Sequence, residues 1–310
     1  MSGPTVGVFD PSLFVTVAVE SHSHGDEIHF HAGGQGLWVA RMIAVLGGRP
    51  TLCTALGDES GDVLRALLRR EEIELRSPES ASRNGAYVDD RRSGERERLA
   101  EDAPAPFGRH EVDDLYGAAL VTGLDAGTMV LAGPQPPELV DADVYRRLAH
   151  DLSQGGARVV ADLSGEHLLA AIEGGADVVK IDERELVEAG FVDQDPDEAE
   201  IVGALDELAR HGASLVVVSR GADPTLALAD GTVLECRGPQ FDAIDSAGSG
   251  DSLTATLATG LARGDEAADV LRLGMAAGAL NVTRRGLGTG SREEIEQLAA
   301  HVEVEERSAA

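Results

Sequence analysis

Beyond residue 128 the chain alternates short apolar runs with longer amphipathic stretches. The apolar runs occupy residues 128–131, 159–162, 178–181 and 215–218, and the amphipathic stretches occupy residues 145–154, 168–173 and 198–211. Short apolar runs of this kind predict strands that are buried on both faces, whereas apolar spacing near 3.6 residues predicts helices. Their alternation predicts an α/β fold, a doubly wound and mostly parallel sheet with helices on both faces.

Two segments follow a different rhythm. Residues 14–31 and 85–100 alternate loosely between apolar and polar side chains, which is typical of strands with one solvated face. We therefore expect a small β-sheet lid over the edge of the main sheet. Its segments, residues 12–32 and 83–100, would be inserted in a single domain of residues 1–310.

The two ends of the chain add further expected elements. A first strand at 6–9, a helix at 37–46, a hairpin at 225–234, helices that begin near Ser252 and Ala267, and a frayed segment at 303–310 complete the set. The N-terminus lacks the basic-then-apolar order of a secretory signal, and we interpret it as the first strand. We therefore expect a cytoplasmic protein.

Composition excludes several classes of partner. The net charge of −29 disfavours nucleic acid and anionic membranes, which would both repel the chain. No apolar run approaches the ~20 residues that cross a bilayer. The two cysteines, Cys53 and Cys236, make neither a disulfide framework nor a metal cluster. An anionic small-molecule substrate would need a locally basic site.

The sharpest chemical signal is the segment 245–252, Asp-Ser-Ala-Gly-Ser-Gly-Asp-Ser, directly before a predicted helix at 253–262. Small residues let backbone N–H groups crowd around an anion, and the helix start adds its positive dipole end. Asp251 in the first turn would face that anion and accept a hydroxyl proton, as phosphoryl transfer requires. The alternative is a glycine turn in which Asp251 or Ser252 serves as a helix N-cap.

Five other short motifs occur along the chain together with this segment. They are Gly-Gly-Gln-Gly at 33–36, Leu-Gly-Asp-Glu-Ser-Gly at 56–61, Asp-Leu-Ser-Gly at 162–165, Lys-Ile-Asp-Glu-Arg-Glu-Leu at 180–186 and Ser-Arg-Gly-Ala at 219–222. In this order and spacing, together with the glycine turn before Asp251, they resemble the motifs of the ribokinase-like (PfkB-type) carbohydrate kinases. The nearest branch is that of the 1-phosphofructokinases and tagatose-6-phosphate kinases.

The resemblance implies an ATP-dependent carbohydrate kinase. Asp251 would be the proton acceptor, and the backbone at Gly248, Ser249 and Gly250 would form the anion hole for the transferred phosphoryl group. The acceptor would be a hydroxyl of a sugar phosphate. The lid would close over it and exclude water.

The same resemblance assigns the nucleotide and metal side. Asp182 and Glu185 would hold Mg²⁺ through water, with Asp182 where the family usually has Asn, and a carboxylate suits this cation at least as well. Alternatively, Asp182 caps a helix and Glu185 is a solvated first-turn acid. Ser219 and Gly221 would lie near the ATP phosphates and ribose. Asn281, with the residues up to 286, either approaches adenine or lies on a helix surface.

On the acceptor side the chain departs from the family. Gly33 and Gly34 match the family's motif, and Asp10, a further candidate for the acceptor site, stands where the resembled branch has Asn. Gln35 stands where a phosphate-binding Lys is common. Phe14 replaces an Asp that grips sugar hydroxyls in the resembled branch, and Trp38 replaces an Asn that usually bonds sugar. A buried hydroxyl left unpaired costs about 1–3 kcal/mol, so the ordinary pose of a fructose phosphate is in question.

Three explanations compete for this departure. Asp10, His29 and His31 supply replacement polar contacts; or the acceptor is a nucleoside or other ring-bearing alcohol that stacks on Trp38 or Phe14; or turnover has been lost. Retention of the Asp251 base speaks against the last. Trp38 as plain core packing is an equal alternative to stacking.

The lid segments hold further candidates. Arg83 occupies a position where the family often has an Arg that touches substrate phosphate, and a bidentate guanidinium suits that role. The nearby arginines at 91, 92, 96 and 98 are expected to pair with neighbouring acids on a solvated face. The four histidines at 22, 24, 29 and 31 form either a metal cluster or a solvated lid edge. No cysteine or acidic set completes a metal site in the sequence, so we expect the solvated edge.

Two rival functions remain open. One is a non-catalytic nucleotide-binding protein on the same fold, and the other is a kinase of an unphosphorylated sugar or a nucleoside. By analogy with family branches whose lids pair between subunits, we also expect a homodimer through the lid. Fold-level resemblance does not fix the acceptor.

Overall fold

A large mixed sheet forms the centre of the molecule. The structure, a computed structural model, describes residues 3–93, 96–239, 241, 248–283 and 288–307. The strand order of the large sheet is β15-β14-β13-β12-β11-β10-β9-β1-β4-β5, with β6 paired to β4. Neighbours from β12 to β5 are parallel, and β13, β14 and β15 are antiparallel additions at one edge. The predicted doubly wound, mostly parallel sheet is confirmed.

The strands of this sheet have the following bounds: β1 Thr5–Ser12, β4 Arg49–Gly57, β5 Glu74–Arg76, β6 Glu79–Ser80, β9 Thr128–Leu131, β10 Arg158–Asp162, β11 Val178–Asp182, β12 Leu215–Arg220, β13 Asp223–Ala229, β14 Thr232–Arg237 and β15 Glu303–Arg307. The central strands are buried along most of their length, because their apolar side chains meet helices on both faces.

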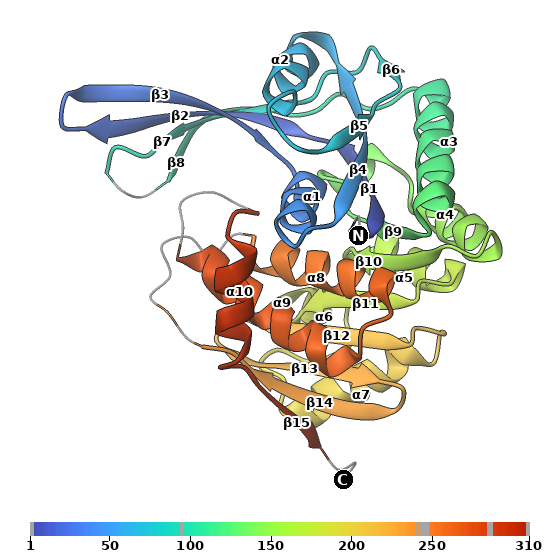
Figure 1. The fold of residues 1–310 in the computed structure, drawn as a ribbon. Helices are drawn as coiled ribbons and strands as arrows, with labels where there is room; N and C mark the ends of the chain where they lie inside the picture. Colours follow the sequence, from blue (N-terminus) through green and yellow to red (C-terminus); the bar gives the residue numbers. More distant parts are fainter. Residues whose placement is uncertain (1–2, 94–95, 240, 242–247, 284–287, 308–310) are drawn as a thin grey trace.

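Helices cover both faces of this sheet (Figure 1). One face packs against α3 Arg109–Ala126, α4 Ala142–Gln154, α5 Gly165–Gly174, α6 Glu183–Glu188 and α7 Glu198–Ala209. The other packs against α1 Gln35–Val45, α2 Asp58–Leu68, α8 Ser249–Arg263, α9 Ala267–Val282 and α10 Arg292–Ala299. A 3₁₀ turn spans Pro137–Leu139. Within the described residues, no helix is both long and apolar enough to span a bilayer.

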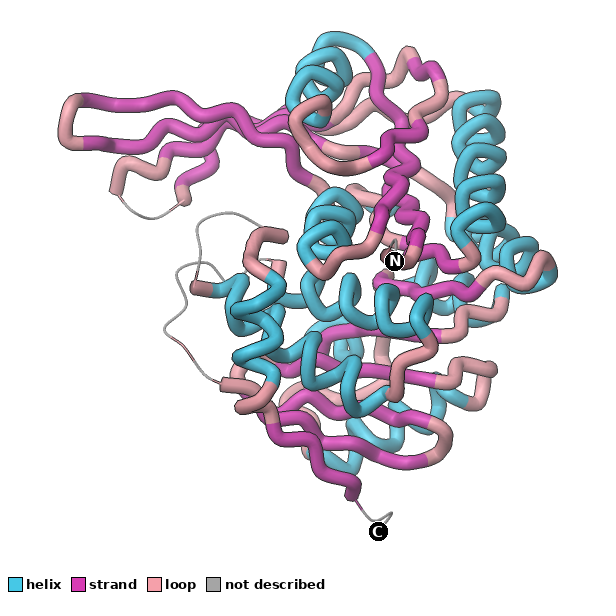
Figure 2. The backbone as a smooth tube through the Cα atoms, in the orientation of Figure 1, coloured by secondary structure: helices cyan, strands magenta, loops and turns pink. Residues whose placement is uncertain are grey.

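A second, four-stranded sheet projects from this body, as Figures 1 and 2 show. Its order is β3-β2-β7-β8, formed by β2 Phe14–His22, β3 Gly25–Gly33, β7 Gly85–Asp90 and β8 Glu97–Asp102. The predicted small sheet is therefore confirmed as part of the fold. Its first strand begins later than residue 12, because Ser12 still belongs to β1 and pairs with Ala55 of β4.

Several regions differ from the sequence expectation, which had no element at the positions of β4, α2 and α10. The frayed segment expected from 303 onward is wrong for residues 303–307, which form β15 against β14; residues 308–310 lie outside the described residues. Arg307 anchors this charged edge strand by ion pairs with Glu198 and Glu235. The long helix α3 had no clear periodic signal, since its buried face carries small and polar residues such as Ala119 and Thr122 beside Leu115.

The turn between β3 and α1 requires glycine at Gly34. Its φ of 143° lies in a region that side-chain-bearing residues rarely adopt. A Cβ there would stand 2.6 Å from Leu13 Cδ2 and 3.1 Å from Asp10 Oδ2. The missing side chain lets the start of α1 approach the end of β1, where Gly36 N donates a 2.8 Å hydrogen bond to Asp10 Oδ2.

We predict that Gly34→Ala lowers the free energy of unfolding by about 1–3 kcal/mol, because it combines backbone strain with a steric clash. Gly117→Ala is the matched control, because Gly117 lies inside α3 and a Cβ there meets no atom within 4 Å. The control should gain about 0.5–1 kcal/mol from helix propensity. Urea unfolding of both variants measures the difference, and equal effects would contradict the assignment.

Candidate active site

The carboxyl ends of the parallel strands gather the polar residues that the sequence singled out. Asp10 is near the end of β1, Asp162 ends β10 and Asp182 ends β11. Helix α8 begins at Ser249, and it contacts β1, β10 and β11. Ligands of open α/β sheets bind outside the carboxyl ends of the strands, and this edge is therefore the candidate site.

A buried ion pair lies at the centre of this edge. Lys180 Nζ is 3.2 Å from Asp162 Oδ1, and both residues are buried. The second carboxylate oxygen of Asp162 accepts a 2.6 Å hydrogen bond from Thr254 Oγ1 of α8. A Cβ on Gly250 would stand 2.8 Å from Lys180 Nζ, so glycine at this position lets the ammonium reach the first turn of α8.

Asp251 lies beside this pair and is itself buried. Burial and the Asp162 carboxylate raise the pKa of Asp251 from 3.8 to about 8, against the opposing effect of the Lys180 ammonium. The Asp10 and Glu185 carboxyls raise it further. A carboxyl group with a pKa close to neutrality, at the first turn of a helix, is suited to accept and release a proton.

Asp10 is the second carboxyl group with a raised pKa. Burial raises it to about 6, and the hydrogen bonds from the backbone N–H groups of Gly36 and Ser12 lower it in part. Asp10 and Asp251 interact electrostatically, so the structure brings these two predicted residues together. The Asp162, Glu185 and Asp251 carboxyls share the Lys180 ammonium, and carboxyl groups that share one cation cannot all be ionised at low cost.

The predicted anion hole is partly described. Gly248 adopts φ 77° immediately before α8, a conformation that glycine takes without strain. The N–H groups of a helix's first turn have no partner inside the helix, and with the dipole they favour an anion. Gly248, Ser249 and Gly250 therefore stay predicted as the anion hole. The predicted turn residues 245–247 lie outside the described residues.

Asp182 and Glu185 form a reciprocal N-terminal cap of α6. Glu185 N donates to Asp182 Oδ1 at 2.7 Å, and Asp182 N donates to Glu185 Oε2 at 2.9 Å. Asp182 therefore caps the helix, as the alternative interpretation expected. Glu185 is not the solvated acid of that interpretation, because it is half-buried and burial raises its pKa. The carboxylate oxygens outside these two bonds are hard donors of the kind that hold Mg²⁺ through water, so the donor set fits the ion.

Ser219 and Gly221 lie next to Asp182. Ser219 pairs in register with Asp182 across β11 and β12, and Gly221 turns the chain with φ 60°. Asn281 is buried in α9, where its Oδ1 accepts a 3.1 Å hydrogen bond from Gly288 N, so it is not a mere helix-surface residue. The predicted adenine contacts at 284–286 lie outside the described residues.

Gln35 binds two strand ends with its amide group. Its Oε1 accepts from Gly133 N at 2.9 Å, and its Nε2 donates to the Asp162 carbonyl at 3.3 Å. A lysine has no acceptor and could not make the first of these bonds. Gln35 therefore holds the loops after β9 and β10 against the start of α1.

The two aromatic substitutions pack against each other. The Phe14 and Trp38 ring centroids are 5.9 Å apart, and those of Phe14 and Tyr87 are 4.8 Å apart, both edge to face. Gly33 lies against the Phe14 ring, where a Cβ would stand 2.4 Å from Phe14 Cε2. Aromatic packing thus occupies the base of the small sheet.

Arg83 contacts the small sheet rather than the Lys180 cluster. Its Nη2 is 2.9 Å from Asp102 Oδ1, its Nε donates to the Ala103 carbonyl at 3.2 Å, and its side chain is 48% exposed. A surface ion pair of this kind is weak enough to be exchanged for a substrate phosphate.

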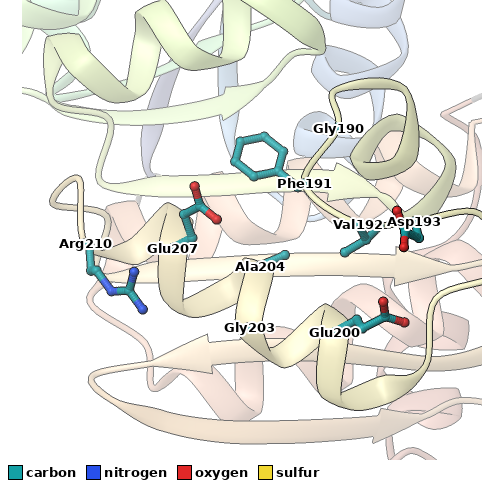
Figure 3. A pocket seen from close by; sticks show the side chains of 9 residues that line it. All are labelled: Gly190, Phe191, Val192, Asp193, Glu200, Gly203, Ala204, Glu207 and Arg210. Carbon is teal, nitrogen blue, oxygen red and sulfur yellow. The ribbon is translucent and has the colours of Figure 1, made fainter.

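A surface pocket of about 430 Å³ lies elsewhere, on the face formed by α7 and the loop after α6 (Figure 3). Its lining includes Phe191, Glu207 and Arg210, and it includes no predicted site residue. We therefore assign it no part in the chemistry.

Sequence reasoning gave no role to Lys180 and Asp162, although both lay in quoted motifs. The available signal was that Lys180 is the only lysine of the chain and stands in an apolar run that predicts a buried strand. A buried lysine needs a charged partner, and Asp162 ends the neighbouring strand at the same edge.

A buried carboxyl group at a helix N-terminus, beside a buried ammonium at the edge of an α/β sheet, is an arrangement suited to phosphoryl transfer. Residues 8–294 match the model of the family described as pfkB family carbohydrate kinase. The chain belongs to that family and is a carbohydrate kinase.

Curated relatives cover most of the chain. ATP-dependent 6-phosphofructokinase isozyme 2 of Mycobacterium tuberculosis is 28% identical over 299 residues, which are 93% of this chain and 86% of the relative. The 1-phosphofructokinase of Bacillus subtilis is 27% identical over 277 residues, 88% of each chain.

Solved structures show the same fold. Phosphofructokinase-2 of Escherichia coli in complex with potassium superimposes with a TM-score of 0.84 at 25% identity, and the match covers 97% of this chain and 99% of the other. The same enzyme in complex with fructose-6-phosphate gives a TM-score of 0.81 at 25% identity, with the same shares of the two chains covered. The ribokinase of Arabidopsis thaliana, at 19% identity, 96% and 99% coverage and a TM-score of 0.74, supports the fold.

We predict that Lys180→Met lowers the free energy of unfolding by about 3–5 kcal/mol, because it leaves the Asp162 carboxylate buried without its cation. The double variant Lys180→Met/Asp162→Asn should be more stable than Lys180→Met alone. Arg146→Met, which removes the surface ion pair with Asp143, is the control and should cost at most about 1 kcal/mol. Similar losses in Lys180→Met and Arg146→Met, measured by thermal unfolding, would contradict the central role of Lys180.

Proposed function

We propose that this protein transfers the γ-phosphoryl group of Mg-ATP to a hydroxyl of a sugar phosphate of the fructose phosphate class. The observation that carries the proposal is the buried Asp251 carboxyl, which lies in the first turn of α8 and interacts electrostatically with the Lys180–Asp162 pair. The phosphofructokinase relatives and the solved fructose-6-phosphate complex support the acceptor class.

In this mechanism the chain positions groups and moves one proton. Asp251 accepts the proton of the attacking hydroxyl, while the N–H groups at Gly248, Ser249 and Gly250 hold the transferred phosphoryl oxygens. Asp182 and Glu185 would hold Mg²⁺ through water, and the ion would supply charge neutralisation on the phosphates.

The remaining predicted residues bind the two substrates. The nucleotide side is lined by Ser219, which pairs in register with Asp182, and by Gly221. Asn281 of α9, the helix that packs against α8, lines it as well. The acceptor lies on the side of Asp10, Gly33, Gly34, Gln35 and Trp38, with Arg83 exchanging its surface ion pair for the acceptor phosphate. The small sheet acts as a lid that excludes water over the acceptor.

We further propose a homodimer through the small sheet. Ile28 and Phe30 lie on one face of β3 and are 62% and 56% exposed. Exposed apolar side chains side by side on a projecting sheet are typical of an association surface. Light scattering should give the mass of two chains for the native protein and of one chain for Ile28→Asp/Phe30→Asp, whereas Val121→Asp, at another exposed apolar residue, should remain a dimer.

The proposed reaction predicts turnover on one class of acceptor and its loss in Asp251→Asn. ADP release with Mg-ATP would be measured on fructose 6-phosphate, fructose 1-phosphate, tagatose 6-phosphate, free hexoses, ribose and nucleosides. Loss of the base should lower kcat by about 10²–10⁴-fold with ATP binding retained.

Two outcomes would overturn it. Turnover confined to free sugars or nucleosides, with Arg83→Met as active as the native enzyme, would favour a kinase of unphosphorylated acceptors. ATP binding without turnover on any acceptor would favour a non-catalytic nucleotide-binding protein.

We predict that kcat/KM rises with pH and levels off above about pH 8, because Asp251 must be ionised to act as the base and its pKa is raised to about 8. The raised pKa means that the folded chain holds the proton more tightly than the unfolded chain. The free energy of unfolding should therefore fall as the pH rises from 3.8 to about 8, and Asp251→Asn should lessen that fall. A pH–rate profile without this rise would contradict the role of Asp251.

A further inference from the structure

The hairpin of β2 and β3 carries a polar face near its outer end, the part of the small sheet that reaches furthest from the body (Figure 1). The pairing register is Glu20 with Glu27, Ala18 with His29, and His22 with Gly25. Paired residues point to the same face of a sheet, as do alternate residues along a strand. Glu20, His22, Glu27 and His29 therefore share one face.

Three of these side chains converge to a point. One ligand atom each from Glu20, His22 and His29 lies within 4.8 Å of the other two. Zn²⁺ binds imidazole nitrogen and carboxylate oxygen at about 2.0–2.2 Å, so the ligand atoms of a tetrahedral site lie about 3.3–3.6 Å apart. Small rotations of side chains that are exposed or half-buried are enough to close this difference.

His29 has an unused ligand atom at this point. Its Nε2 is buried and has no hydrogen-bond partner within the described part of the chain, although Glu27 Oε2 lies 3.5 Å away. A buried nitrogen without a partner is unfavourable, and a metal ion is one of the groups that can satisfy it. Glu27 Oε2 also lies 3.9 Å from His22 Nε2, so a second carboxylate is available to complete or orient the ligand set.

The local charge suits a cation, because Glu20 and Glu27 bring two carboxylates to the cluster. Arg91 Nη1 lies 3.8 Å from Glu20 Oε1, so a metal ion would compete with this guanidinium for the Glu20 carboxylate. The His-rich donor set favours Zn²⁺ and similar borderline ions over Mg²⁺, which prefers oxygen ligands. The sequence alone indicated a solvated edge, because only the register of β2 with β3 brings Glu20 and His22 to His29.

We propose that Glu20, His22 and His29 form a binding site for one divalent transition-metal ion of the Zn²⁺ type on the small sheet. This site is separate from the proposed Mg²⁺ position at Asp182 and Glu185. A bound ion would tie β2 to β3 near the end of the hairpin and so stabilise the sheet.

The test is a Zn²⁺ titration by calorimetry, with tag-free protein freed of metal by a chelator and with Mg²⁺ in excess to occupy oxygen-rich sites. We expect one Zn²⁺ per chain. His22→Gln, His29→Gln and Glu20→Gln should each weaken binding by at least about tenfold. His24→Gln is the matched control, because His24 lies in the exposed turn outside the cluster, and it should bind like the native protein.

Absorption of Co²⁺ provides a second readout. The native protein and His24→Gln should show the visible bands of a four-coordinate ion, and His29→Gln should lose them. Equal Zn²⁺ affinity in His29→Gln and His24→Gln, or no Zn²⁺ binding by the native protein, would overturn the proposal. Thermal unfolding in metal-free buffer checks that the variants are folded; if His29→Gln is not, the comparison of Glu20→Gln with His24→Gln decides.

Discussion

The site depends on one buried ammonium among three carboxyl groups. Burial lowers the pKa of Lys180, but the Asp162, Glu185 and Asp251 carboxyls outweigh it and raise the pKa above its ordinary value. Lys180 therefore stays charged and lies 3.2 Å from Asp162 Oδ1, while the buried Asp251 beside this pair has a raised pKa. The cluster thus combines an ion pair with a carboxyl group of raised pKa, a combination suited to acid–base chemistry at one site.

The backbone around this cluster is shaped to let it form. Gly250 leaves room for the Lys180 side chain at the start of α8, and Gly34 lets α1 approach Asp10. Gln35 then connects the loops after β9 and β10 with both ends of its amide. The start of α1, the start of α8 and three strand ends are therefore held by side-chain and backbone contacts at a single edge. An arrangement fixed by so many contacts needs little reorganisation when a phosphoryl group is transferred.

The main sheet and the small sheet could be predicted from the sequence because their periodicities differ, near-continuous apolar runs in one and alternation in the other. The region of Asp251 could be predicted because a glycine turn before a helix has a recognisable composition. The ion pair of Lys180 and Asp162 could not, since the two residues come from different strands and only the parallel register brings them together. Helix α3 and strand β15 were not predicted because the hydrophobic periodicity of their sequences is weak. Strand β15 is held instead by tertiary contacts such as the ion pairs of Arg307.

The proposed acceptor side carries aromatic contacts at two positions where the family resemblance predicts polar side chains. Phe14 packs against Trp38 and Tyr87, and the absence of a side chain on Gly33 makes room for the Phe14 ring. These aromatic contacts stabilise the junction of the small sheet with the body, whereas the polar side chains that the family usually has there bind the sugar. Asp10 is the buried carboxyl that remains on this side, and it interacts with the proposed base. In the proposed mechanism the acceptor hydroxyls are therefore recognised mainly from the side of Asp10 and the α1 start, so that recognition and proton transfer depend on the same cluster of charges.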